Sequence, residues 1–180
     1  VGRLNSDLAN DLGNLLNRTL GMYKKYFNGV VVASSTSEEI DDVIKAMFDE
    51  TIKDVEKYMY LFEFSRALET IWKFISRLNK YIDETKPWEL AKDESRKDEL
   101  QSVIYHLIAG LRHIAVLINP LLGETSKEIL RQIGNNEEIS WDTLLEFEKM
   151  PTTKVIEKGE PIFMRLIEAD EIEYIKNLMK

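Results

Sequence analysis

The sequence predicts an all-α fold, a helical bundle of about five main helices, on three observations. Apolar residues recur at three- and four-residue steps through most of the 180 residues, which is the spacing of one helix face. The apolar stretch over residues 40–82 contains neither proline nor glycine, which indicates helices without internal breakers. Pro87 and Pro120 fall where apolar periods stop, as expected of residues that end helices.

Composition favours one soluble domain spanning residues 1–180. The chain is 44% apolar and 31% charged, without a linker-like stretch, and no apolar run approaches the roughly 18 residues that cross a bilayer, so we expect no membrane segment. It contains no cysteine and no signal-peptide pattern, which fits a cytoplasmic protein. Because the chain also lacks a start methionine and begins almost at once with a helix, we expect it to be an excised domain without its upstream partner.

The net charge of −8 disfavours nucleic acid as a partner, because phosphate attraction usually dominates such binding. The charge is unevenly distributed, however, since basic residues gather in the first 30 residues and acidic residues in the next 30. A basic site on an acidic body therefore remains compatible with the sequence.

Residues 5–29 predict the clearest amphipathic helix of the chain. Ser6 or Asp7 is expected to cap its start, and Gly29 suits its end because glycine readily takes the left-handed conformation of a helix C-terminus. The apolar stripe of this helix consists of Leu8, Leu12, Leu15, Leu16, Thr19, Leu20, Tyr23 and Phe27.

Asn14, Arg18, Gly21 and Lys25 share one line on the opposite face of that helix. An amide and a guanidinium one turn apart can offer donors and an acceptor to the flat edge of a base, and Gly21 leaves room for a close ligand. The alternative interpretation of this ridge is an ordinary solvated face. The spacing alone leaves both interpretations open.

Two antiparallel helices are expected next, with a break near residues 60–64, where the apolar period fails within Tyr58, Met59, Tyr60, Leu61 and Phe62. Thr36 with Glu39 fits a capping box at the start of the first. The aromatic residues of the second are expected to pack in the core because they fall at helical spacing among Leu and Ile; they are Phe64, Trp72, Phe74 and Tyr81.

Pro87 is expected to stop the preceding helix and to open a short one as its first-turn residue, which puts Trp88 at a corner. Beside Lys86 and Lys92, Trp88 could provide a stacking platform for an unpaired base. It could equally be a corner tryptophan that plugs the core.

Residues 100–118 predict a central helix, because they are apolar over much of their circumference. His106 and His113 on this helix lack the Glu-x-x-His pattern of a di-metal site, so we interpret them as core or surface histidines. Thr125 with Glu128 fits a capping box for a short helix that ends at Gly134.

The C-terminal third is expected to be largely irregular before one last helix. Over residues 135–162, the side chains of Trp141, Leu144, Leu145 and Phe147 should anchor a polar, proline-containing segment onto the bundle. A helix over residues 168–179 should follow, and its buried side should carry Ile172, Ile175 and Leu178 or Met179.

The sequence contains no phosphate-binding glycine loop, no nucleophile elbow and no metal-ligand spacing, and its carboxylates form no recognisable acid–base pair. From the residues alone the chain is therefore a binding or scaffold module. Enzymatic chemistry is not expected to reside in it.

Three motifs resemble the C-terminal anticodon-binding domain of methionyl-tRNA synthetases, class I aminoacyl-tRNA synthetases. They are Asp7-Leu8-Ala9-Asn10-Asp11-Leu12-Gly13-Asn14-Leu15-Leu16-Asn17-Arg18 followed by Tyr26-Phe27-Asn28-Gly29, then Ala67-Leu68-Glu69-Thr70-Ile71-Trp72 through Asn79-Lys80-Tyr81-Ile82, and Lys86-Pro87-Trp88-Glu89-Leu90-Ala91-Lys92. The tail Glu160-Pro161-Ile162-Phe163-Met164-Arg165 is similar to the segment that closes this domain. Related synthetases for other amino acids share parts of the first and third motifs.

The resemblance implies that an Asn and an Arg one turn apart bind the wobble cytosine of the CAU anticodon and that a Trp after a Pro stacks on it. These roles fall on Asn14, Arg18 and Trp88, and Pro87 at the corner and Lys25 on the same ridge complete the candidate tRNA-contacting residues.

It further implies that this chain serves a methionine–tRNA ligase and binds the anticodon loop of methionine tRNAs. The chain itself needs no cofactor, whereas the N-terminal catalytic domain of the parent enzyme uses ATP and Mg²⁺. The alternative is a helical scaffold or dimerisation module with no RNA role.

Overall fold

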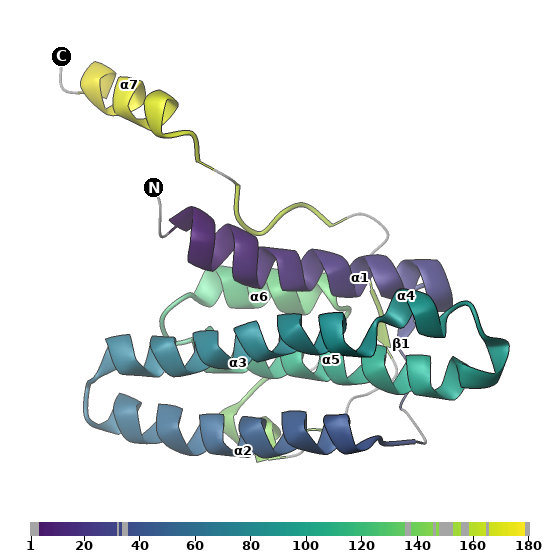
Figure 1. The fold of residues 1–180 in the computed structure, drawn as a ribbon. Helices are drawn as coiled ribbons and strands as arrows, with labels where there is room; N and C mark the ends of the chain where they lie inside the picture. The colour runs from purple at the N-terminus through teal and green to yellow at the C-terminus, as the bar shows by residue number, and fades with distance from the viewer. Residues whose placement is uncertain are drawn as a thin grey trace.

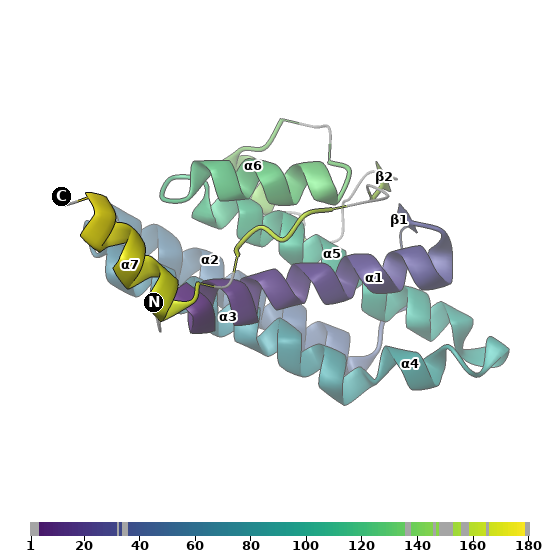
Figure 2. The same cartoon turned by 90° about the horizontal axis from the view of Figure 1, so that it is seen from above.

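The computed structural model describes residues 4–31, 33, 36–135, 138–145, 147, 153–155, 159–164 and 166–178. Long helices lie side by side along a common direction, and the short helix α4 lies at one end of the bundle (Figures 1 and 2). The elements in chain order are η1 (Leu4–Gly13), α1 (Asn14–Phe27), β1 (Val30–Val31), α2 (Glu39–Tyr60), α3 (Phe64–Thr85), α4 (Pro87–Leu90), η2 (Glu94–Arg96), α5 (Lys97–Ile118), α6 (Gly123–Gln132), η3 (Trp141–Leu145), β2 (Thr153–Lys154) and α7 (Glu168–Leu178). This architecture confirms the predicted all-α bundle.

Helix α5 is the centre of the bundle, as its apolar circumference predicts. Nearly every residue from Leu100 to Ile118 is buried, and α5 contacts α1, α2, α3, α4 and α6. By length and hydropathy, the stretch Glu94–Ile118 could also span a bilayer, but 94% of its most apolar window is buried inside the bundle. That is the burial of a core helix.

The first helix forms a continuous rod, η1 followed by α1. Most of the predicted apolar stripe is buried along it, with Leu8 and Phe27 at its two ends half-buried. The part that precedes Asn14 winds as a π-helix, which the apolar spacing did not indicate. The rod ends as predicted, because Asn28 and Gly29 take φ values of 51° and 76°.

Three predicted helix starts are wrong by two or more residues. The rod is already helical at Leu4, so Ser6 and Asp7 lie inside it and do not cap it. Helix α6 begins at Gly123, two residues before the predicted cap Thr125. At α2, the backbone N–H of Glu38 donates to the carboxylate of Asp41 (2.9 Å), which forms the N-terminal box two residues after Thr36.

The predicted break between the second and third helices is confirmed. Helix α2 ends at Tyr60 and α3 begins at Phe64, and the two pack side by side (Figure 1). Phe74 and Tyr81 are buried as predicted and Trp72 is half-buried. The prediction is wrong for Phe64, which is 43% exposed because it opens α3 at the outer end of the hairpin.

A buried polar group joins α2, α3 and α5 inside the core. The Tyr81 hydroxyl and the Ser102 hydroxyl (2.9 Å) both donate to the fully buried carboxylate of Asp41, and His106 Nδ1 lies 3.7 Å from it. The carboxyl oxygens of Asp41 therefore have hydrogen-bond donors around them, as buried polar atoms require.

The second histidine of α5 is also a core residue, as predicted. His113 is buried between the rings of Phe48 and Phe147, and burial lowers the pKa of its imidazole to about 4. Among the residues that the structure describes, no group of three or more His, Cys, Asp or Glu side chains could hold a metal ion.

The segment after α6 is anchored largely as predicted. Gly134 takes a φ of 73° at the end of α6, Leu144 and Phe147 are buried and Trp141 is half-buried. The side chain of Leu145 lies outside the described residues. Strand β2 pairs antiparallel with β1, which ties this segment to the end of the first rod.

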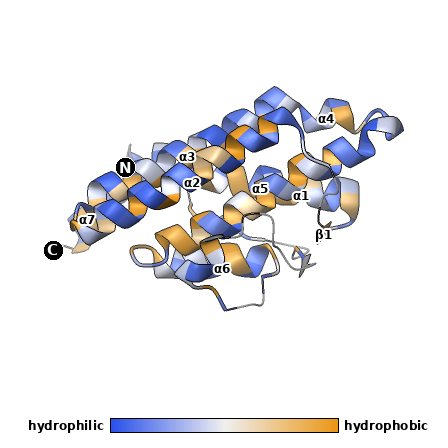
Figure 3. Ribbon diagram, turned by 90° about the horizontal axis from the view of Figure 1, so that it is seen from below, coloured by the Kyte–Doolittle hydropathy of each residue, from blue (hydrophilic) through white to orange (hydrophobic). Residues whose placement is uncertain are grey.

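The predicted burial of the last helix is wrong. Helix α7 forms over the expected residues, but Ile172, Ile175 and Leu178 are all exposed, and none of its described residues is buried. Its apolar side chains are exposed because α7 projects away from the bundle (Figure 1). The long helices of the bundle carry hydrophobic and hydrophilic residues along their length (Figure 3). Met179 and Arg165, also named in the sequence analysis, lie outside the described residues.

Candidate nucleic-acid interface

The polar ridge predicted on the first helix points away from the core. Asn14, Gly21 and Lys25 are exposed and Arg18 is partly exposed, while the apolar stripe on the other side of α1 is buried. An added Cβ on Gly21 would meet no atom of the protein within 4 Å. The surface above Gly21 is therefore open, so packing does not demand a glycine there.

Three polar contacts fix this rod against α3. Trp72 Nε1 donates to the carbonyl of Asp7 (2.8 Å), and Asn79 Nδ2 donates to the carbonyl of Asp11 (3.1 Å). Further along, Arg18 Nη2 donates to Asp83 Oδ1 (2.6 Å). Residue numbers rise together along the rod and along α3 in these three contacts, so the rod and α3 run in the same direction. The ridge therefore lies beside α3.

The Arg18–Asp83 ion pair connects the ridge to the end of α3. The Asp83 side chain is 65% exposed and that of Arg18 is 29% exposed, so water screens the pair and it contributes little to stability. Its main effect is geometric, because it holds one edge of a guanidinium that has five N–H donors in a fixed plane. The remaining donors can therefore be offered to a ligand in a fixed orientation.

The proline corner forms as predicted. Helix α3 ends at Thr85, Lys86 takes a left-handed φ of 46°, and Pro87 opens α4 as its first-turn residue. Pro87 and Leu90 are buried and anchor this short helix to the bundle. Trp88, by contrast, is 42% exposed, which rules out a side chain sealed in the core.

Arg18 contacts Asp83 in the last turn of α3, and Asp83 precedes Trp88 by five residues. Asn14 lies one turn before Arg18 on the same ridge. Over the described part of the chain, no hydrogen bond or ring contact joins Asn14, Arg18 and Trp88 directly. Their joint use as one site therefore remains a prediction.

Lys25 lies one turn beyond Gly21, with its Nζ 5.1 Å from the centre of the Tyr26 ring. A cavity of about 120 Å³ lies between the end of α1 and the segment from the end of α4 to the start of α5; its lining residues are Tyr26, Phe27, Leu90, Ala91, Asp93, Glu94, Lys97 and Leu100. The end of α1 is thus adjacent to α4. Lys92, expected to flank Trp88 as a cation, instead forms an ion pair with Glu89 (2.8 Å).

Sequence analysis missed Asp83 and Asn79, the α3 residues that hold the rod. A signal was present, because Trp72, Ser76, Asn79 and Asp83 follow four-, three- and four-residue steps and share one α3 face. That face is polar where a core face would be apolar. Only the tertiary pairing of α3 with the rod shows what it contacts.

Comparison of the sequence with known proteins identifies its family. The family described as the anticodon-binding domain of tRNA ligase matches residues 41–180, which include Pro87 and Trp88. The methionine–tRNA ligase of Fusobacterium nucleatum is 60% identical over 179 residues, 96% of this chain and 28% of the relative. That of Bacillus subtilis is 49% identical over 183 residues, all of this chain and 27% of the relative.

Solved structures agree. The apo methionyl-tRNA synthetase of Mycobacterium tuberculosis matches 92% of this chain and 34% of its own, with a TM-score of 0.83 at 27% identity. The chain thus spans between about a quarter and a third of the length of the relatives it matches. It belongs to the family of anticodon-binding domains of tRNA ligases, and its relatives are ligases for methionine.

Proposed function

We propose that this chain binds the CAU anticodon loop of methionine tRNAs, as part of a cytoplasmic methionine–tRNA ligase. The observation that carries the proposal is the Arg18–Asp83 ion pair, because it holds the Arg18 guanidinium at the last turn of α3, the helix that leads into the corner where Trp88 is exposed. The names of the relatives support the choice of tRNA and amino acid.

Each candidate residue has a distinct role in this proposal. Arg18 and Asn14 hydrogen-bond the Watson–Crick edge of the wobble cytosine, since a guanidinium donates to its carbonyl and ring nitrogen and an amide oxygen accepts from its amino group. Trp88 stacks on the same base, and Pro87 fixes the corner that presents the indole. Lys25 contacts phosphate and carries no sequence information.

We propose that the chemistry of aminoacylation belongs to the rest of the ligase. There a catalytic domain, N-terminal to this chain by family resemblance, would use ATP and Mg²⁺. The contribution of this chain is then to select the tRNA. The pure chain should neither form methionyl-adenylate nor exchange pyrophosphate into ATP.

The test is binding of anticodon stem-loops to the full-length ligase that carries this chain. A loop with CAU should bind more tightly than loops changed at any one anticodon position, by about 1–3 kcal/mol for each changed base. Equal affinity for all the loops, at two salt concentrations, would show that binding is electrostatic only and would overturn the proposal. Methionine-dependent exchange by the pure chain would overturn the assignment of chemistry.

A further inference from the structure

The turn between α2 and α3 exposes a group of large apolar side chains. Tyr60, Phe62 and Phe64 are 84%, 78% and 43% exposed, and Leu61 between them is also exposed. We refer to residues 60–64 as the aromatic turn. Ordinary protein surfaces rarely expose a contiguous apolar patch, and such a patch usually marks an interaction site.

The backbone of the aromatic turn holds these side chains outward. Phe62 has a φ of 59°, a left-handed conformation that bulky side chains rarely adopt. Backbone hydrogen bonds from Phe62 N–H to Met59 (3.1 Å) and from Glu63 N–H to Tyr58 (2.8 Å) fix the turn. A strained residue that is well held and exposed is typical of a functional position.

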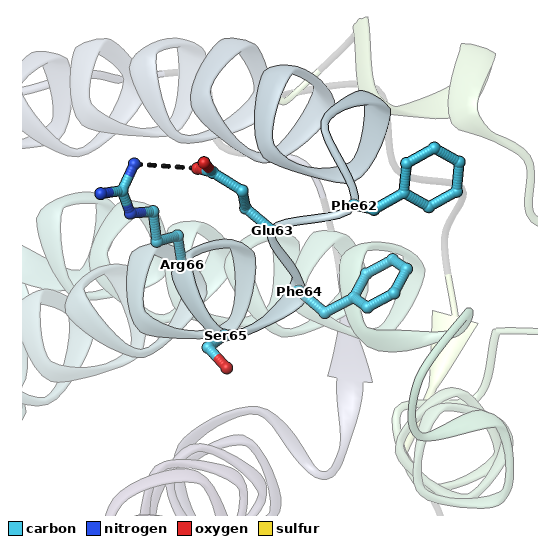
Figure 4. A pocket seen from close by; sticks show the side chains of 5 residues that line it. All are labelled: Phe62, Glu63, Phe64, Ser65 and Arg66. Atoms are coloured by element: carbon cyan, nitrogen blue, oxygen red, sulfur yellow. Dashed lines mark hydrogen bonds and ion pairs between the residues drawn. The ribbon is translucent and has the colours of Figure 1, made fainter.

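The two phenylalanine rings form one surface. Phe62 and Phe64 lie edge to face with their centroids 6.1 Å apart, and both rings point to the same side, away from the Glu63–Arg66 ion pair (2.9 Å) (Figure 4). A shallow hollow of about 330 Å³ lies beside them, lined by Phe62, Glu63, Phe64, Ser65 and Arg66. The surface is therefore preorganised: an aromatic pair with a polar rim.

The described ends of the chain lie at this same end of the bundle. Asp7, three residues after the first described residue, accepts from Trp72, which lies about 12 Å along α3 from Phe64. Asn5 exchanges two hydrogen bonds of 2.8 Å with the backbone of Leu166, just before α7. Figures 1 and 2 show the N-terminus, α7 and the α2–α3 turn at one end.

Helix α7 extends the apolar character of this end. Most of the exposed large apolar side chains found among the described residues belong either to the aromatic turn or to the segment from Met164 onward. The second group consists of Met164, Ile167, Ile172, Tyr174, Ile175 and Leu178. Branched aliphatic side chains offer no stacking surface to a base, so this composition favours a protein partner over RNA.

We infer that the aromatic turn is an interdomain docking surface for the remainder of the ligase chain. The inference rests on the proposed function, because the partner is the part of the ligase that this chain does not contain. The chain spans only 27–28% of its curated relatives, and a segment joined to either end would enter at the same end of the bundle as the aromatic turn. A tethered partner at this end has a high effective concentration there.

The partner surface has a definite chemistry. It is an apolar pocket that receives the Phe62 and Phe64 rings, rimmed by hydrogen-bond acceptors. We expect acceptors at the rim because α3 begins at Phe64 without a side-chain cap, and the first-turn N–H groups of an uncapped helix can donate to a partner as well as to water.

The first test uses hydrogen exchange in the unsubstituted full-length ligase. If the turn is docked, the first-turn amides of α3 (Phe64, Ser65 and Arg66) should exchange at least tenfold more slowly than the first-turn amides of α2 (Glu39 and Ile40), which serve as the internal control. Equal exchange at the two helix starts would overturn the inference.

The second test measures thiol accessibility in the full-length ligase at two positions. Val43, 49% exposed on α2 away from the turn, is the matched control for Phe62. In this chain position 62 is the more exposed of the two, yet the thiol of Phe62→Cys should be alkylated at least tenfold more slowly than that of Val43→Cys, read by peptide mass. Equal or faster alkylation at position 62 would overturn the inference.

Two further outcomes would replace the proposed occupant. Protection at position 62 that disappears on dilution would identify a second copy of the protein, and protection that appears only with added tRNA would identify RNA. Stem-loop binding in the same preparations reports on the proposed function separately. Loss of anticodon preference with persistent protection would contradict that function and leave the docking surface standing.

Discussion

At the α4 end of the bundle one tryptophan stands half exposed among charged side chains, whereas at the α2–α3 end several aromatic and aliphatic side chains are exposed together. Lys86 and Glu89 flank Trp88 in the sequence, and the Arg18–Asp83 pair lies in the last turn of α3 just before this corner, so the surroundings of Trp88 are polar and charged. Near Phe62 the neighbours are Tyr60, Leu61 and Phe64. An exposed aromatic residue therefore has no fixed meaning, and the residues around it decide what it binds.

Truncation of one exposed aromatic side chain at each end, Trp88 or Tyr60, should give the largest difference in RNA affinity between the two ends. Trp88→Ala should weaken the binding of every anticodon stem-loop by about 1–3 kcal/mol, because stacking does not depend on base identity. Tyr60→Ala, the control, removes a side chain that is 84% exposed at the other end and should leave stem-loop affinity unchanged. Equal losses in a fluorescence binding assay would break the distinction between the ends.

Much of the fold follows from the sequence because helix spacing and proline act locally. The break after Tyr60 and the central position of α5 were predictable from the spacing of apolar residues, and the corner at Pro87 was predictable from the proline. Helix starts were less predictable, since Thr36 and Thr125 match a capping pattern that the backbone satisfies elsewhere. A short pattern cannot show which N–H groups are already bonded.

Burial was predictable only where a partner surface exists within the chain. Ile172 and Ile175 of α7 and Phe64 of α3 have the spacing of buried residues, but they are exposed among the residues that the structure describes. Periodicity predicts a face that can pack, and it does not supply the partner. The same limit hid Asp83, because its contact with Arg18 joins positions 65 residues apart.

A substitution at Gly21 on the ridge should have an effect of intermediate size on stability and on RNA affinity. Gly21→Ala should stabilise the fold by about 0.5–1 kcal/mol, because alanine favours the exposed helix and its Cβ meets open space. It should at the same time weaken RNA binding if a nucleotide lies against α1. Thermal unfolding and stem-loop titration measure the two effects.

Gly110, a buried glycine on α5, provides a control for the stability effect expected at Gly21. In Gly110→Ala, the new Cβ would lie 2.6 Å from Leu78 Cδ1 in the core, so this variant should destabilise the protein by about 1–3 kcal/mol. If Gly21→Ala stabilises the fold and leaves RNA affinity intact, no nucleotide approaches the ridge at that point.

The smallest expected effect comes from a matched pair of lysines. Lys25 and Lys57 place their Nζ atoms 5.1 Å and 5.4 Å from the rings of Tyr26 and Tyr58, at the two ends of the bundle. Lys25→Ala should weaken the binding of all stem-loops equally, by less than about 1 kcal/mol. It should also reduce the salt dependence of that binding by about one charge. Lys57→Ala should change neither, and an equal change in both would place phosphate contacts at both ends.

The most direct test of base reading is the affinity of Arg18→Ala, in the full-length ligase, for stem-loops with cytosine or uracil at the wobble position, at two salt concentrations. If the guanidinium held by Asp83 reads the base, the variant should lose about 1–3 kcal/mol of affinity for the cytosine loop and much less for the uracil loop, so discrimination collapses. Equal losses for both loops, with a smaller salt slope, would make Arg18 a phosphate contact and contradict its assignment as a base reader.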